Sequence, residues 1–107
     1  MIQLFTELQE KKNVRSNLSA LRASLKEATE EQKAQAIEFV RGHEDLVFGF
    51  LQEEDAKTRK NAALLLGDLA VQNALQPLWK AYTREQTLFV KSACIDTCRN
   101  TWKGNID

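Results

Sequence analysis

His43 is the only histidine of the chain and a candidate for acid–base chemistry. It is followed by Glu44, and an imidazole beside a carboxylate can transfer protons near neutral pH. However, Gly42 places His43 in a predicted turn, where a capping or solvated role is the usual one. No serine or cysteine stands in a nucleophile motif, and no glycine-rich phosphate loop occurs. An enzyme that uses His43 with Glu44 is therefore the least favoured of three hypotheses.

Cys94 and Cys98 are the second pair of residues with reactive side chains. They stand four positions apart on one predicted helix, so they could supply two zinc ligands, but a structural zinc site needs four and the sequence has no second pair. A disulfide is disfavoured because helical i and i+4 positions orient the Cβ atoms poorly, and because we expect a reducing compartment. The sequence predicts two buried free thiols, with no metal and no cofactor.

Hydrophobic residues at helical spacing fill the chain, and capping signals divide them into six or seven helices. The apolar stripe of residues 2–28 is either one long helix or two; two are favoured because Asn13 can act as an N-cap. Thr29 and Gln32 have the spacing of a capping box, and Gly42 is a natural C-terminal stop. Three later helices are expected to begin at Asp55, Asn73 and Thr87, the last of them with Leu88 facing inward.

Gly67 stands inside a predicted helix of good helix formers. Glycine in a helix interior costs about 1 kcal/mol relative to alanine. Its presence is best explained by the close approach of a neighbouring helix, so a bulkier residue there should destabilise the fold.

Residues 46–100 contain one pattern twice, offset by 32 positions, and a period of this length with helical spacing is typical of stacked helix hairpins. The first copy, LQEEDAKTRKNAALLLGDL at residues 51–69, resembles the hairpin of a HEAT repeat in its acidic turn, its Thr58–Arg59 pair and its Leu66-Gly67-Asp68 segment. Residues 73–102 resemble a second copy, which departs from the pattern at Thr97-Cys98-Arg99, as an end repeat would.

The resemblance implies an all-α fold: a short right-handed, armadillo-like α-solenoid of stacked antiparallel helix hairpins. We expect one HEAT-like domain over residues 1–103, with irregular N-terminal helices at 1–42, repeats at 43–70 and 72–102, and a frayed tail at 104–107. An inserted helix between the first hairpin and these repeats would interrupt the strict array.

The resemblance also implies a structural role for recurring charges. Six positions before Arg59, Lys91 and Arg15 stand Glu53, Glu85 and Gln9, respectively. The implied role of such side chains is a ladder that joins hairpin to hairpin. Alternatively, a basic strip along the second helices would be available to an acidic protein tail or a phosphate backbone; it would consist of Arg15, Arg59, Lys60, Lys91 and Arg99. Fifteen basic and fifteen acidic residues cancel, which argues against a general attraction to polyanions.

The predicted function is a non-enzymatic protein–protein interaction or scaffold module that binds through the surface of its second helices. The candidate binding residues are Arg15, Arg22, Lys57, Arg59, Lys60, Lys91, Asp96 and Arg99, with Trp79 and Trp102 as exposed aromatics near the open end of the stack. The expected partner is another protein or domain. The alternative is a nucleic-acid or substrate-positioning helical domain that accompanies a modifying enzyme, with nucleic acid as partner.

No small-molecule substrate is indicated. The N-terminal residues lack the features of a secretory signal, and no apolar stretch approaches the ~20 residues that cross a bilayer. We therefore expect a cytoplasmic protein without a membrane partner.

Overall fold

The computed structural model describes residues 2–106, and it describes side chains for residues 2–99. The elements of this part are seven α-helices and two short 3-10 helices, so the all-α prediction is confirmed. In chain order they are α1 (Ile2–Gln9), α2 (Val14–Lys26), α3 (Glu30–Gly42), α4 (Glu44–Gly49), η1 (Phe50–Gln52), α5 (Ala56–Asp68), η2 (Gln72–Ala74), α6 (Leu75–Arg84) and α7 (Leu88–Ile106). α7 continues through residues 104–106, which were expected to fray, because a single glycine at 104 costs a helix only about 1 kcal/mol.

The first block forms two helices, as favoured, but its turn is built differently from the expectation. Lys11 and Asn13 both adopt left-handed backbone conformations, with φ of 57° and 47°, which asparagine tolerates better than most residues. The Asn13 side chain makes no capping hydrogen bond. Instead, the Asn17 side-chain amide donates to the Lys12 carbonyl oxygen at 2.8 Å. The predicted position of the helix start is right, and the predicted side-chain cap is wrong.

The caps at Thr29 and Asp55 are confirmed. The Thr29 hydroxyl accepts from the Gln32 backbone N–H at 3.1 Å, while the Gln32 side chain accepts from the Thr29 N–H at 3.0 Å. The Asp55 carboxylate accepts from the backbone N–H of Thr58 at 3.0 Å and from its hydroxyl at 2.8 Å. These bonds satisfy backbone donors that a helix start otherwise leaves without partners.

The starts of α6 and α7 differ in part from the expectation. Asn73 lies inside η2, and its side chain donates to the Glu44 carboxylate at 3.2 Å instead of capping α6. Thr87 does occupy the N-cap position, since its carbonyl oxygen accepts from the Lys91 N–H at 3.0 Å. Leu88 was expected to face inward but is 80% exposed, because the buried side of α7 is set by Val90 and Cys94.

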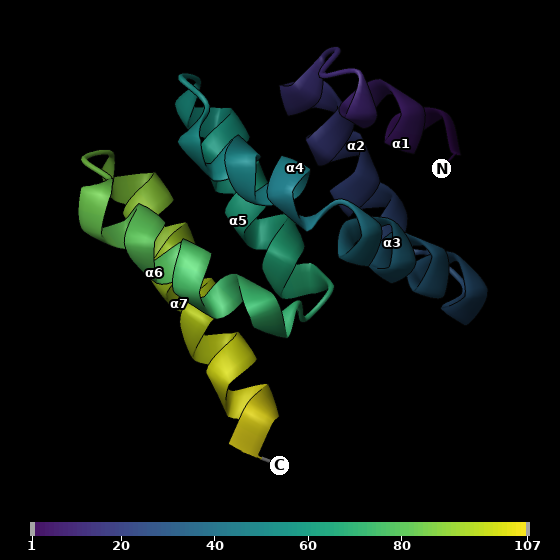
Figure 1. The fold of residues 1–107 in the computed structure, drawn as a ribbon. Helices are drawn as coiled ribbons and strands as arrows, with labels where there is room; N and C mark the ends of the chain where they lie inside the picture. Colours follow the sequence, from purple (N-terminus) through teal and green to yellow (C-terminus); the bar gives the residue numbers. More distant parts are fainter. Residues whose placement is uncertain (1, 107) are drawn as a thin grey trace.

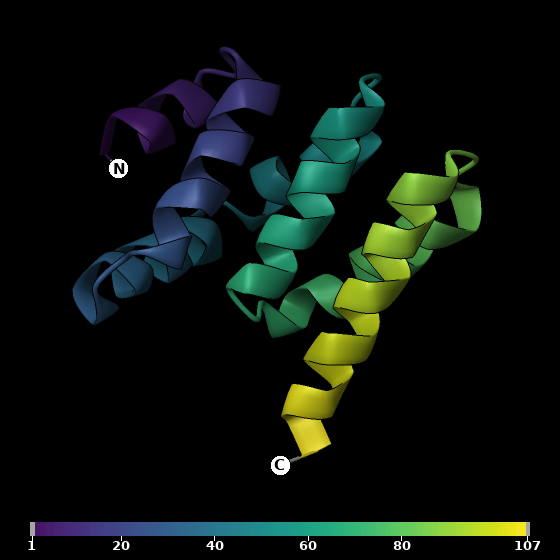
Figure 2. The same ribbon diagram turned by 180° about the vertical axis from the view of Figure 1, so that it is seen from behind.

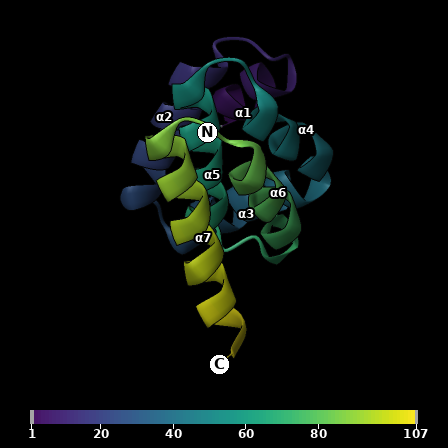
Figure 3. The same ribbon diagram turned by 90° about the vertical axis from the view of Figure 1, so that its left-hand side faces the viewer.

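Three helix pairs lie side by side (Figure 1). α5 packs between α2 and α7, and these three helices form one layer when the molecule is seen from behind (Figure 2). α1 packs on α2, η1 on α5 and α6 on α7, so α1, α4 and α6 lie together on the other side (Figure 3). α3 is additional to the three pairs: it connects α2 with α4.

The contact of α5 with α7 explains the helical glycine. A Cβ atom added at Gly67 would lie only 2.9 Å from Thr97 Cγ2 and 3.2 Å from Thr97 Oγ1. Thr97 is buried between the helices, with 3% of its surface exposed. The predicted close approach at Gly67 is confirmed, and α7 is the neighbouring helix.

Candidate functional site

An open groove of about 750 Å³ separates the second and third helix pairs on the side of their first helices. We call it the η1–α6 groove. Its floor is apolar and consists of Phe48, Leu51, Pro77 and Ala81. Its rim carries the amide side chains of Gln52, Gln76 and Gln86, three acidic residues (Glu53, Glu54 and Glu85) and three basic residues (Arg59, Lys80 and Arg84).

A buried ion pair between Arg59 and Glu85 closes one end of this groove. Arg59 Nε donates to Glu85 Oε2 at 2.8 Å and Arg59 NH2 donates to Oε1 at 2.9 Å. The side chains are only 17% and 8% exposed. Arg59 NH1 also donates to the carbonyl oxygens of Glu53 and Glu54, at 2.7 and 2.8 Å. One guanidinium therefore ties the turn before α5 to the turn before α7.

The two partners of this pair stabilise each other's charged forms. The hydrogen bond to Glu85 raises the pKa of Arg59. Burial by itself raises the pKa of Glu85, but hydrogen bonds from Arg59 and from the Thr87 backbone outweigh it, so that this pKa is lowered. Because both groups stay charged and each satisfies the other, the pair is a fixed and electrically neutral end wall.

Two further ion pairs link α2 to the second helix pair. Arg22 Nε donates to Asp68 Oδ2 at 2.8 Å, and Arg15 NH1 lies 3.4 Å from Asp55 Oδ1. Arg22 also borders a smaller hollow of about 410 Å³ between α2, α3 and the end of α5. The Arg15 and Asp55 side chains are 57% and 47% exposed, so this pair contributes little to stability. Ion pairs therefore do join neighbouring helix pairs.

Counting from each helix start shows which residue of α2 corresponds to Arg59. Arg59 stands four residues after its N-cap Asp55, and the residue four after Asn13 is Asn17, not Arg15. Asn17 also plays the same part, because its side chain donates to the carbonyl of the preceding turn, as Arg59 does. Asn17 does not stand out in the sequence because the repeated pattern aligns basic residues. Its equivalence to Arg59 appears only when positions are counted from the helix start.

Nine of the ten candidate binding residues have side chains that the structure describes, and these nine do not form one patch. Lys57 and Lys60 lie on α5, and Lys60 Nζ is 6.0 Å from the centroid of the exposed Phe89 ring. Asp96 and Arg99 are exposed on α7. Arg15, Arg22 and Arg59 are engaged with carboxylates. Lys91 and Trp79 lie against the Tyr82 ring, and the side chain of Trp102 is outside the described residues.

Trp79 and Lys91 meet at Tyr82. The Trp79 and Tyr82 rings stack with centroids 5.4 Å apart, and Lys91 Nζ lies 4.9 Å from the Tyr82 centroid. Trp79 is 53% exposed. A stacked aromatic pair under a cation on an open surface is typical of contact sites for other proteins.

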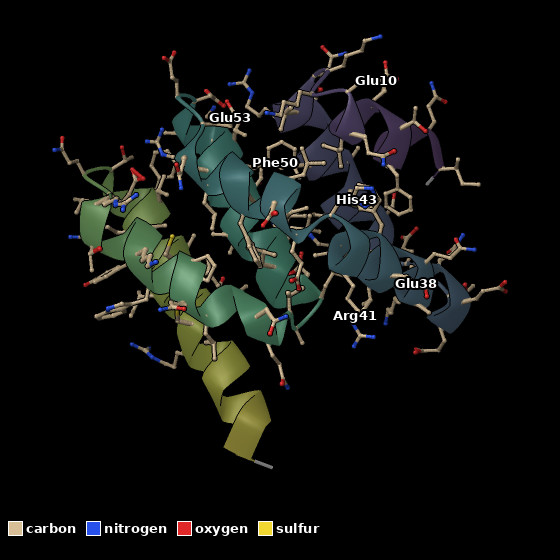
Figure 4. The ribbon with its side chains drawn as sticks, viewed as in Figure 1. Glu10, Glu38, Arg41, His43, Phe50 and Glu53 are labelled. Atoms are coloured by element: carbon tan, nitrogen blue, oxygen red, sulfur yellow. The ribbon has the colours of Figure 1, made fainter. Side chains whose placement is uncertain are left out.

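His43 serves as a bridge between helices. Its Nδ1 lies 2.8 Å from the Phe39 carbonyl oxygen and its Nε2 lies 2.6 Å from Gln9 Nε2. Its ring stacks on Phe39, which stacks in turn on Phe5, each at 4.5 Å between centroids. Figure 4 shows His43 between α1 and α3. These contacts fit one tautomer, in which Nδ1–H donates to the carbonyl and Nε2 accepts from the Gln9 amide.

The cysteines also differ from each other in their surroundings. Cys94 is fully buried, and burial raises the pKa of its thiol to about 11. Cys98 was expected to be buried too but is half-buried; burial also raises its pKa. Both are free thiols. Within the described part of the chain, no three His, Cys, Asp or Glu side chains gather closely enough to hold a metal ion.

In comparisons with known proteins, no family model, no curated protein and no solved structure matches the chain. The HEAT resemblance therefore stays a prediction from the residues. None of the helices in residues 2–106 combines the length and the apolar character that crossing a lipid bilayer requires.

Proposed function

We propose that the chain is a non-enzymatic protein-interaction module, a short right-handed α-solenoid of the HEAT type, that binds an extended segment of another protein in the η1–α6 groove. The arrangement of α1/α2, α4–η1/α5 and α6/α7 as adjacent pairs supports the solenoid. The groove itself is the observation that supports the function: it has the size of a ligand site, an apolar floor and a polar rim.

The chemistry of the groove suits a peptide. Gln52, Gln76 and Gln86 carry amides that both donate and accept hydrogen bonds, which is what an extended peptide backbone requires. The apolar floor offers space for one or two aliphatic or aromatic side chains. Lys80 on α6 and Glu54 on the opposite turn place unlike charges on the two sides, so a bound segment with charges of its own has a preferred direction.

Nucleic acid is less well supported as a partner. The three basic residues of the groove are balanced by three acidic ones, and Arg15 and Arg22 are engaged with Asp55 and Asp68. Binding to a phosphate backbone depends on an excess of positive charge over a continuous surface. No such surface stands out among the described residues.

The test is selection of binding peptides from a random phage-displayed library, followed by fluorescence anisotropy with the purified chain. Ala81→Arg fills the groove floor and Lys80→Glu reverses a rim charge at an exposed position that cannot unfold the helix. Selected peptides should bind each variant about tenfold or more weakly, since one or two central contacts dominate such sites. Arg41→Ala, at an exposed position of α3 outside the groove, is the matched control and should leave affinity unchanged.

Peptides that bind both groove variants as well as the parent would refute this proposal. So would tight, salt-dependent binding of a random RNA or DNA oligonucleotide that competes with the selected peptides.

A further inference from the structure

The second and third helix pairs can be compared position by position, because equivalent residues are 32 apart in the sequence. Asp55 and Thr87 occupy the two N-cap positions, and Arg59 and Lys91 stand four residues after them. Some positions of the second pair are covered by residues of the third pair. The equivalent positions of the third pair show which side chains a further hairpin would have to cover.

One stripe of α5 faces the third pair. Arg59 binds Glu85 and Gly67 touches Thr97. Ala63 lies midway between them at four-residue spacing, hence on the same face of the helix, and it is fully buried. The stripe begins one turn earlier at Ala56, which is half-buried.

The corresponding stripe of α7 is open. Leu88, the counterpart of Ala56, is 80% exposed. Lys91 and Ile95, the counterparts of Arg59 and Ala63, are only half-buried, and Arg99, the counterpart of Gly67, is exposed. Opposite Arg99 a docked helix therefore needs a residue smaller than the Thr97 that meets Gly67. Together with Trp79 and Tyr82 on the adjoining side of α6, these residues form a surface with exposed leucine and tryptophan side chains, which we call the outer face (Leu88, Lys91, Ile95, Trp79 and Tyr82). Exposed apolar groups gathered in this way mark interaction sites.

We infer that the outer face docks a helical hairpin of another protein, whose turn presents a carboxylate to Lys91. The partner's chemistry follows from the interface already formed inside the chain, where the turn before α7 presents Glu85 to Arg59. Lys91 occupies the position of Arg59 but contacts the Tyr82 ring, and it can exchange this cation–π contact for a charge-assisted hydrogen bond. Small apolar side chains, like Val90 and Ala93 of α7, are the shape complement to the stripe.

A second copy of this chain fits the outer face less well. Glu85 stands two residues before the N-cap Thr87, and the residue two before Asn13 in the first helix pair is Lys11. A copy docked head to tail through its first pair would therefore set Lys11 against Lys91. Like charges at an interface oppose docking, so a hairpin with an acidic turn fits the outer face better than this arrangement of two copies.

The outer face is distinct from the η1–α6 groove. Pro77 and Ala81 line the groove, whereas Trp79 and Tyr82 point to the neighbouring side of the same helix. The inference therefore stands or falls separately from the peptide-binding proposal.

The test supplies a probe hairpin within the full chain. A second copy of residues 72–99 is fused after residue 103, in place of residues 104–107, so that the 32-residue offset continues. Trp102→Phe in the body and Phe in place of tryptophan in the appended copy leave Trp79 as the single tryptophan. Gly in place of Thr97 in the appended copy leaves room for Arg99, which stands where Gly67 admits Thr97. We expect its emission to shift to shorter wavelength and its acrylamide quenching to fall about threefold relative to the unextended Trp102→Phe chain, because a docked hairpin covers the ring.

Charge reversal then tests whether Lys91 pairs with the partner's carboxylate. Lys91→Glu should restore fast quenching, and so should Glu85→Lys made only in the appended copy. The two changes together should protect Trp79 again, which mere loss of helix structure cannot do. Arg41→Glu, at an exposed position of α3, is the matched control outside the outer face and should change nothing.

Three results would overturn the inference. Quenching of Trp79 could be the same with and without the appended hairpin, or the double charge reversal could fail to restore protection. The third is a concentration-dependent dimer of the unextended chain, seen by sedimentation equilibrium, that protects Trp79; it would assign the outer face to a second copy instead. Peptide affinity of the groove should be unaffected in every case.

Discussion

Gly67 offers the sharpest test of how α5 and α7 pack, because a single methyl group there has opposite effects on the helix and on the contact. Alanine in place of glycine gains about 1 kcal/mol of helix propensity. The new Cβ, however, would lie 2.9 Å from Thr97 Cγ2, deep in a buried contact, and overpacking of this kind costs about 1–3 kcal/mol. We expect Gly67→Ala to lower the free energy of unfolding by about 1 kcal/mol.

The second change removes the obstacle. Thr97→Ala deletes both atoms that lie closer than 3.4 Å and leaves only the Thr97 Cβ, at 3.5 Å, which is an ordinary contact. In that background Gly67→Ala keeps its propensity gain without the clash, so it should raise the free energy of unfolding by about 0.5–1 kcal/mol. The sign reversal corresponds to a coupling of about 1.5–2 kcal/mol in a double-mutant cycle.

The assay is urea unfolding followed by far-UV circular dichroism for the four chains of the cycle. Gly49→Ala is the matched control: Gly49 is helical, with φ of −61°, and a Cβ there would meet nothing within 4 Å. It should stabilise the chain equally in both backgrounds. If Gly67→Ala stabilises the parent as much as Gly49→Ala does, or if Thr97→Ala leaves its sign unchanged, the close approach of α5 and α7 is refuted.

Three further predictions concern the charged and thiol groups. Arg59→Ala should lower the free energy of unfolding by about 2–3 kcal/mol, near the lower end for breaking a buried pair, whereas Lys91→Ala should cost under about 0.5 kcal/mol; urea unfolding checks both. The folded-state pKa of Glu85 is lowered, so the contribution of Glu85 to the free energy of unfolding is complete above its unfolded-state pKa and is lost as pH falls through its folded-state pKa. Glu85→Gln should therefore flatten the acid limb of a stability–pH profile; an unchanged limb contradicts this. Burial raises the pKa of the Cys94 thiol to about 11, so at mildly alkaline pH Cys94 should react with a disulfide reagent only as fast as the chain opens. The reaction rate is measured in a Cys98→Ser background, and a rate like that of free cysteine would contradict burial.

The helix starts that could be predicted are those set by neighbours in the sequence. Thr29 and Asp55 cap through donors only three residues away, so a local pattern is sufficient information. Asn73 was misplaced because its side chain binds Glu44, twenty-nine positions earlier in the chain, and no local pattern records that contact. Asn13 was placed correctly but for the wrong reason, since a left-handed backbone and a side-chain cap favour the same residue type.

The candidate site was harder to predict than the fold. Arg59 was singled out from its acidic turn, and its link to the next hairpin followed from the resemblance. The groove itself was not foreseen, because it depends on the distance that the Arg59–Glu85 pair and the turn after η1 set between η1 and α6. Leu88 was expected to be buried as one of the apolar residues of its helix. The open surface on which it lies can be recognised only once the neighbouring helices are known.

Arg59 and Lys91 show how one position in a repeated hairpin can serve two purposes. Arg59 is desolvated between two pairs and has four hydrogen bonds, so its charge is committed to the fold and its removal leaves Glu85 buried without a partner. Lys91 occupies the same position where no further pair covers it, and its charge rests on one aromatic ring. Reversal of the Lys91 charge can therefore change what docks on the outer face at little cost to the fold. The same reversal at Arg59 would remove the ion pair that links the second and third pairs and leave two buried negative charges side by side.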